Sequence, residues 1–222
     1  MKIIFIILVI LLPFSINAQT INFKIDGSIE NIKGAKFAYL STLSQQIPIS
    51  SDKLFMVVSV VDGKFEFNSS FELEGKSIQQ ASIFFDERGN ITKDELALKF
   101  KNLIWVSGRD SHLFRIILEN MRLRSKDRME ADKTVIVSNG TYTKQFYEYE
   151  SAVRNKDLKK VVDFIKTYRN SPISLIALQS VLFFSDDDIE KLNVSASNLF
   201  NNLSPQIISF TKSGKNILSF TL

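Results

Sequence analysis

The chain of 222 residues contains no cysteine. Disulfides, zinc–thiolate sites, iron–sulfur clusters, thiol nucleophiles and CxxC redox pairs all require cysteine, so this chain can form none of them. Its single histidine, His112, likewise excludes a metal site built from several histidines. These absences remove much of the common redox and metal chemistry, and the remaining residue types do not by themselves identify a catalytic site.

Glycine, proline and excess charge of one sign are also scarce. There are 8 Gly and 4 Pro, and 28 basic against 24 acidic residues leave a formal net charge of +4. A content of 45% hydrophobic and 23% charged residues is typical of a folded protein, not of a disordered or collagen-like chain. The length fits one large domain or two small ones. So weak a charge exerts little long-range field, and we expect no nucleic-acid partner.

The first eighteen residues have the pattern of a secretory signal peptide. Lys2 is followed by ten apolar residues, Ile3 to Leu12, then by the helix-breaking Pro13 and the small residue Ala18. A membrane-spanning helix needs about 20 apolar residues, and no later stretch reaches that length either. We therefore predict cleavage after Ala18 and a periplasmic or secreted protein that does not span the membrane; an uncleaved anchor is the alternative. The Ala-Gln junction is typical of exported proteins of Bacteroidetes-type bacteria.

From residue 20 to about 143 the hydrophobic pattern predicts β-strands. Apolar and polar residues alternate from Ile21 to Ile25, and the dipeptide Asp62-Gly63 between two apolar stretches predicts a hairpin with a type I′ turn. Phe65 and Phe67 are expected on one buried face of that hairpin. The predicted strands cover 21–25 (ended by Gly27, resuming near Ile29), 36–40, 54–61, 64–67, 81–85, 99–106, 114–118 and 134–137. Short strands without intervening helices favour an antiparallel β-sandwich or open barrel.

From about residue 145 the spacing of apolar residues becomes helical. Within 157–169 they recur at i, i+3, i+4 and i+7, and Ser171-Pro172 is typical of a helix start. The apolar run 173–184 predicts a buried helix, and further helices are predicted after Ser185 and from Ser204-Pro205. We thus predict an α+β protein with a signal peptide at 1–18, a β-rich domain at 19–143 and a helical segment at 144–222 packed on it.

Three polar clusters have both a chemical and a structural interpretation. The run Arg109-Asp110-Ser111-His112 holds triad residue types, but a triad converges from different segments, so a surface turn is favoured. The basic stretch 122–128 is interpreted as a solvated hairpin or an edge strand protected by charge, in preference to an anion-binding site. The acids 186–188 lack the DxDxDG calcium loop and suit the first turn of a helix. We predict no catalytic, cofactor or metal residues.

Three stretches resemble the DUF4369 family, whose domain precedes a thioredoxin-like domain in exported thiol–disulfide oxidoreductases of Bacteroidetes. They are Phe23–Ile29 with Ala38–Leu40 after it, Val60–Phe67 (VVDGKFEF), and Phe164–Lys166 followed by Asn170–Leu178 (NSPISLIAL). The resemblance covers the mature chain and implies a β-rich domain followed by helices. This chain stops about where the thioredoxin-like domain would begin, so no redox residue is carried over. A truncated or frameshifted gene, a stand-alone accessory protein and a divergent paralogue are all compatible with this pattern.

Two functions from different classes follow. The favoured prediction is a non-catalytic exported accessory or binding module of the bacterial envelope, whose partner would be a thioredoxin-like or other envelope protein. The alternative is an enzyme of unrecognised type that uses carboxylates such as Asp86, Glu87 or Asp110 in a cleft between the two halves.

Overall fold

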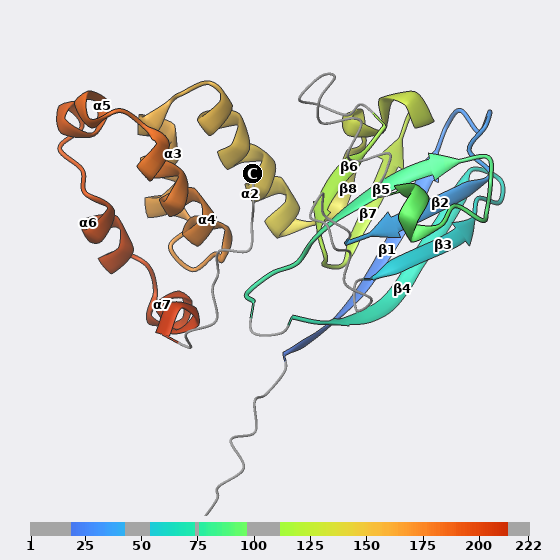
Figure 1. Ribbon diagram of the computed structural model, residues 1–222, viewed down its shortest axis with the longest axis horizontal. Coiled ribbons are helices and arrows are strands. Elements are labelled where there is room, and N and C mark those ends of the chain that lie inside the picture. Colours follow the sequence, from blue (N-terminus) through green and yellow to red (C-terminus); the bar gives the residue numbers. More distant parts are fainter. Residues whose placement is uncertain (1–18, 43–53, 74–75, 97–111, 213–222) are drawn as a thin grey trace, which may run out of the picture.

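The computed structural model describes residues 19–42, 54–73, 76–96 and 112–212 (Figure 1). Within these ranges eight strands form two four-stranded sheets, and a group of helices follows the last strand. The α+β class is therefore confirmed, as two open and mostly antiparallel sheets. The expected signal peptide at 1–18 and the predicted strand at 99–106 lie outside the described residues.

The first sheet has the strand order β4-β1-β7-β8. Its strands are β1 (Thr20–Ile29), β4 (Lys64–Glu72), β7 (Met121–Ser125) and β8 (Val135–Asn139). Only β1 and β7 are parallel neighbours in it. The predicted break at Gly27 is wrong, because β1 continues through it. Glycine is needed there for close approach: a Cβ would lie 1.9 Å from an atom of the Phe65 ring.

The second sheet is antiparallel, with the strand order β3-β2-β5-β6. Its strands are β2 (Phe37–Ser41), β3 (Phe55–Ser59), β5 (Gln80–Asp86) and β6 (Phe114–Ile117). A small apolar cluster of Tyr39, Phe84, Ile91 and Leu96 forms apart from the main core. The Tyr39 hydroxyl donates to the carbonyl of Arg88 at 2.6 Å and accepts from the N–H of Ile91 at 3.2 Å, which fixes the segment after β5.

The turn at Asp62-Gly63 joins the two sheets. Both residues have positive φ, and Val61 and Lys64 exchange two backbone hydrogen bonds of 2.9 Å, as the predicted type I′ turn requires. The strands on either side then separate, since β3 pairs with β2 while β4 pairs with β1 along its whole length. The turn was thus predicted correctly, but the extended hairpin was not.

The main β core lies between the sheets and draws residues from both. Phe65 and Phe67 are both buried, at 6% and 0% exposure, which confirms the face assigned to them. The Phe65 ring meets Phe85 of the second sheet edge to face, with ring centroids 5.3 Å apart. This contact closes the sandwich where β4 faces β5.

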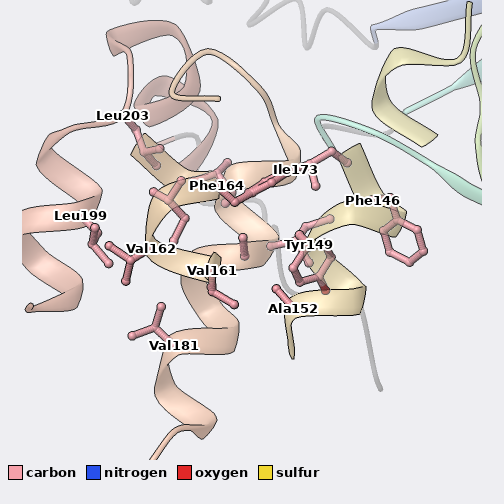
Figure 2. Packing of buried hydrophobic residues seen from close by; sticks show 14 of the residues in the cluster. Phe146, Tyr149, Ala152, Val161, Val162, Phe164, Ile173, Val181, Leu199 and Leu203 are labelled. Carbon is pink, nitrogen blue, oxygen red and sulfur yellow. The ribbon is translucent and has the colours of Figure 1, made fainter. Parts of the chain in front are cut away.

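The helical half has its own apolar core (Figure 2). Its helices are α2 (Thr141–Arg154), α3 (Leu158–Thr167), α4 (Ile173–Ser180), α5 (Asp186–Lys191), α6 (Ala196–Asn201) and α7 (Pro205–Lys212). Helix α2 starts before the predicted change of period near residue 145. The buried helix predicted at 173–184 is buried only in its first part: a short 3-10 turn follows α4 and leaves Leu182 and Phe183 71% and 73% exposed.

Strand β6 and helix α2 join the two halves. Ile117 of β6 and Ile78 before β5 belong to the helical core, and the Thr143 hydroxyl of α2 accepts a hydrogen bond from the N–H of Ile117 at 3.0 Å. In the part of the chain that the structure describes, no helix is long and apolar enough to cross a lipid bilayer.

Candidate functional site

Two of the carboxylates named in the enzymatic alternative, Asp86 and Glu87, lie far from the junction of the two halves. Asp86 ends β5, where its carboxylate accepts from the N–H of Arg88 at 2.8 Å, and exposed Glu87 pairs with Lys36 at 3.2 Å. The junction is at the other end of β5, where Gln80 pairs with Ile117. Six residues of strand separate the two ends by roughly 20 Å. Asp110 lies outside the described residues, as do the other members of its cluster apart from His112, which precedes β6.

The basic stretch lies in a hairpin, since β7 pairs antiparallel with β8, the next strand in the chain, but the edge-strand alternative is wrong. Its first part is β7, an interior strand between β1 and β8, in which Arg122 and Arg124 face solvent while Leu123 and Ser125 are buried. The two arginines are the solvent-facing residues of a strand in which buried and exposed side chains alternate. The charges therefore mark the solvated face of the sheet, and the edge on this side of the sheet is β8.

The three acids at 186–188 occupy the first turn of α5, as the structural interpretation predicted. The Ser185 hydroxyl caps this helix by accepting from the N–H of Asp188 at 3.2 Å. Among the described residues, no group of three or more Asp, Glu, His or Cys side chains is placed to hold a metal ion.

A candidate site lies at one flank of the sandwich, where β6 ends the second sheet and β8 ends the first (Figure 1). Helix α2 follows β8 directly and crosses this flank. A pocket of about 340 Å³ lies between these elements, and we refer to it as the flank pocket. It is lined by Phe114, Asp132, Thr134, Ile136, Lys144 and Tyr147.

An aromatic pair forms one wall of the flank pocket. Tyr147 of α2 stacks on Phe114 of β6, with ring centroids 5.7 Å apart and planes 11° from parallel. The Tyr147 hydroxyl donates to the carbonyl oxygen of Arg115 at 2.8 Å, which holds the ring in place. Ile136 faces the core from β8. These three side chains give the pocket an apolar surface suited to an aliphatic or aromatic group.

Polar groups complete the lining. The Thr134 hydroxyl oxygen is buried and has no hydrogen-bond partner in the described part of the chain. A buried polar atom without a partner costs about 1–3 kcal/mol, so a polar group of a ligand placed there would be favourable. Lys144 is exposed and forms no ion pair with any described residue.

The outer boundary of the site is the β8 edge, Val135–Asn139. Its far side pairs with no other strand within the described ranges. No residue of this strand is charged, and Val135 and Val137 are each 51% exposed. Natural edge strands usually carry lysine, proline or inward-pointing charge that discourages pairing, and the β8 edge has none of these. Its irregular register with β7 between Arg122 and Leu123 is the one protective feature present.

A second, larger depression of about 420 Å³ lies where α3 and α5 begin, and its two carboxylates already have partners. Asp157 accepts from the N–H of Lys160 at 3.0 Å and pairs with its ammonium at 3.1 Å, and Asp188 accepts from Ser185 at 2.6 Å. Local capping accounts for these contacts, so the flank pocket is the stronger candidate.

Sequence reasoning predicted strands at 114–118 and 134–137 but did not bring them together. Phe114, Ile136 and Tyr147 come from three elements, and no short-range pattern places them in one pocket. The sequence matches no protein-family model, and neither a curated protein nor a solved structure is significantly similar to it. The similarity to the DUF4369 family stays a prediction.

Proposed function

We propose that this protein is a non-catalytic accessory or binding module of the bacterial envelope, and that it captures an extended segment of a partner protein at the β8 edge. The observation that carries the proposal is an uncharged edge strand with two exposed valines beside the flank pocket, whose outer side pairs with no other strand among the described residues. Export rests on the signal-peptide pattern of residues 1–18. A thioredoxin-like or other envelope protein as the partner rests on the resemblance alone.

Strand addition suits this edge for physical reasons. An added strand forms main-chain hydrogen bonds to the open side of β8, and these supply affinity whatever its sequence. Side chains beside Val135, which pairs opposite the outward-facing Arg124, add cross-strand contacts worth roughly 0.2–1 kcal/mol each, and exposed Val137 at the irregular register offers further apolar contact. The rest of the sandwich provides the rigid support.

The test is selection of linear peptides from a random displayed library on the chain from residue 19 to 222. Hydrogen exchange then locates the bound peptide. We expect enriched peptides that slow exchange at residues 135–139. The variant Val135→Lys/Val137→Lys adds the charge that natural edges carry and should lose this binding.

The matched control is Val57→Lys/Val61→Lys, which makes the same change at valines that are 42% and 63% exposed in or next to β3 of the other sheet. It should bind like the parent protein. The proposal is contradicted if both double variants bind equally well. It is also contradicted if the bound peptide protects only other strands from exchange, or if no peptide is enriched.

A further inference from the structure

We infer that the flank pocket receives an apolar side chain from the added segment, and that this segment is acidic. The inference rests on strand addition at the β8 edge and specifies which sequences the edge accepts.

The geometry follows from the alternation of side chains in a strand. A strand added to β8 lies about 4.8 Å beyond it, and every second side chain turns to the inner face. Ile136 marks that face, since it packs against the sandwich core and lines the flank pocket. An inward side chain of the added strand therefore enters the space between Ile136 and the Phe114–Tyr147 pair. An aliphatic or aromatic side chain suits this position.

The charges near the β8 edge determine which charged residues are favoured in the added segment. On the pocket side Lys144 forms no ion pair with a described residue, and on the outer face the same holds for Arg122 of the neighbouring strand. Arg124 reaches Glu30 only at 4.0 Å. Asp132 lines the pocket together with Lys144, so the two opposite charges offset each other on that side. The exposed arginines of β7 therefore set the preference, and they favour carboxylates and disfavour lysines on the outer face of the incoming segment.

The same cations argue against a second copy of this chain as the occupant. Antiparallel pairing of β8 with β8 across a twofold axis would bring both copies of Arg122 to one interface. Like charges placed together in this way oppose association. An acidic foreign segment has no such conflict.

The experiment uses three labelled nonapeptides and fluorescence anisotropy with the chain from residue 19 to 222. In the first peptide, Val or Phe alternates with Glu. The second replaces each Glu with Lys, and the third replaces each apolar residue with Ser. We expect the first to bind and the other two to bind at least roughly tenfold more weakly.

Variants locate each effect. Arg122→Glu, on the exposed outer face of β7, should weaken binding of the acidic peptide and strengthen binding of the Lys peptide. Lys156→Glu, an equal charge change at the exposed turn before α3, should leave the preference as it is. Tyr147→Ala should reduce the advantage of the apolar peptide over the Ser peptide. If Tyr147→Ala does not fold, Ile136→Ala tests the same wall.

The outcomes separate the two proposals. If binding is lost in Val135→Lys/Val137→Lys but does not change in Arg122→Glu or when the apolar residues of the peptide are replaced, the inference about the pocket and the acidic segment is overturned and strand addition stands. Binding that is unaffected by the valine substitutions would overturn both. A dimer of the free protein that becomes monomeric in Val135→Lys/Val137→Lys would show that a second copy covers the edge, and would overturn the inference of an acidic foreign segment.

Discussion

The carboxylate of Glu119 accepts a hydrogen bond from the N–H of Thr143 at 2.7 Å and another from its hydroxyl at 3.0 Å. It also accepts from the N–H of Tyr142 at 3.2 Å. Gly140, which precedes α2, has no side chain with which to cap the helix. The turn between β6 and β7 therefore supplies the cap of α2, and the start of the helix is fixed to the sandwich.

Loss of this cap should weaken the whole protein. We expect Glu119→Ala to lower the free energy of unfolding by about 1–2 kcal/mol, because it leaves N–H groups of the first turn without their acceptor. Glu119→Gln keeps one acceptor oxygen and should cost less. Urea unfolding measures both, with exposed Glu87→Ala as the control. Parent-like unfolding of Glu119→Ala would show that the contact contributes nothing.

The burial of Phe67 can be tested against an exposed phenylalanine of the same chain. Phe67 is 0% exposed between the sheets, whereas Phe183 is 73% exposed after α4. Phe67→Ala should cost about 3–5 kcal/mol of stability, and Phe183→Ala should stay within about 0.5 kcal/mol of the parent. Thermal and urea unfolding check both. Equal effects from the two substitutions would refute the burial assigned to these residues.

The contact between Gly27 and Phe65 predicts a coupled pair of substitutions. A methyl group at residue 27 would overlap the Phe65 ring, so Gly27→Ala should destabilise the protein by roughly 1–3 kcal/mol. Phe65→Leu removes part of that ring at its own cost. The double variant should therefore be more stable than the sum of the two single effects implies. Simple additivity in urea unfolding would rule out the overlap.

Local pattern predicted most of the secondary structure. Alternation at 21–25 marked β1, the Asp62-Gly63 signal gave the correct turn, and Ser185 capped the helix expected after it. The basic stretch was predicted to be a hairpin or an edge strand, but the alternation of Arg122 and Arg124 with buried Met121 and Leu123 does not say whether a strand lies at the edge or inside the sheet. The start of α2 was placed too late, since Thr141 to Thr143 resemble strand residues and their cap comes from Glu119.

The candidate site could not be predicted in the same way, because it depends on which strands become neighbours. A two-residue turn specifies its own dihedral angles but not whether the strands beyond it stay paired, and here β3 and β4 enter different sheets. The exposure of β8 is a property of the complete strand order. Phe114, Ile136 and Tyr147 meet only after both sheets and α2 have packed.

The last prediction concerns acid. Asp157 caps α3, and the hydrogen bond from the N–H of Lys160, more than any other contact, holds the pKa of its carboxyl below the ordinary value. A carboxyl whose pKa is lower in the folded state stabilises that state above the unfolded-state pKa. This contribution is lost as the pH falls through the folded-state pKa. Part of the protein's loss of stability in acid should therefore come from Asp157.

Asp157→Asn tests this, because asparagine also caps a helix but does not titrate in this range. The parent should be the more stable at pH 7, and the difference between the two proteins should shrink between about pH 5 and pH 2. Urea unfolding at several pH values measures that difference. The pKa of Asp127 is also lowered, mainly by the N–H of Met129. Asp127 is present in both proteins, so its contribution cancels in the difference between their stabilities. A difference that stays constant from neutral to acid pH would show that Asp157 does not couple protonation to folding.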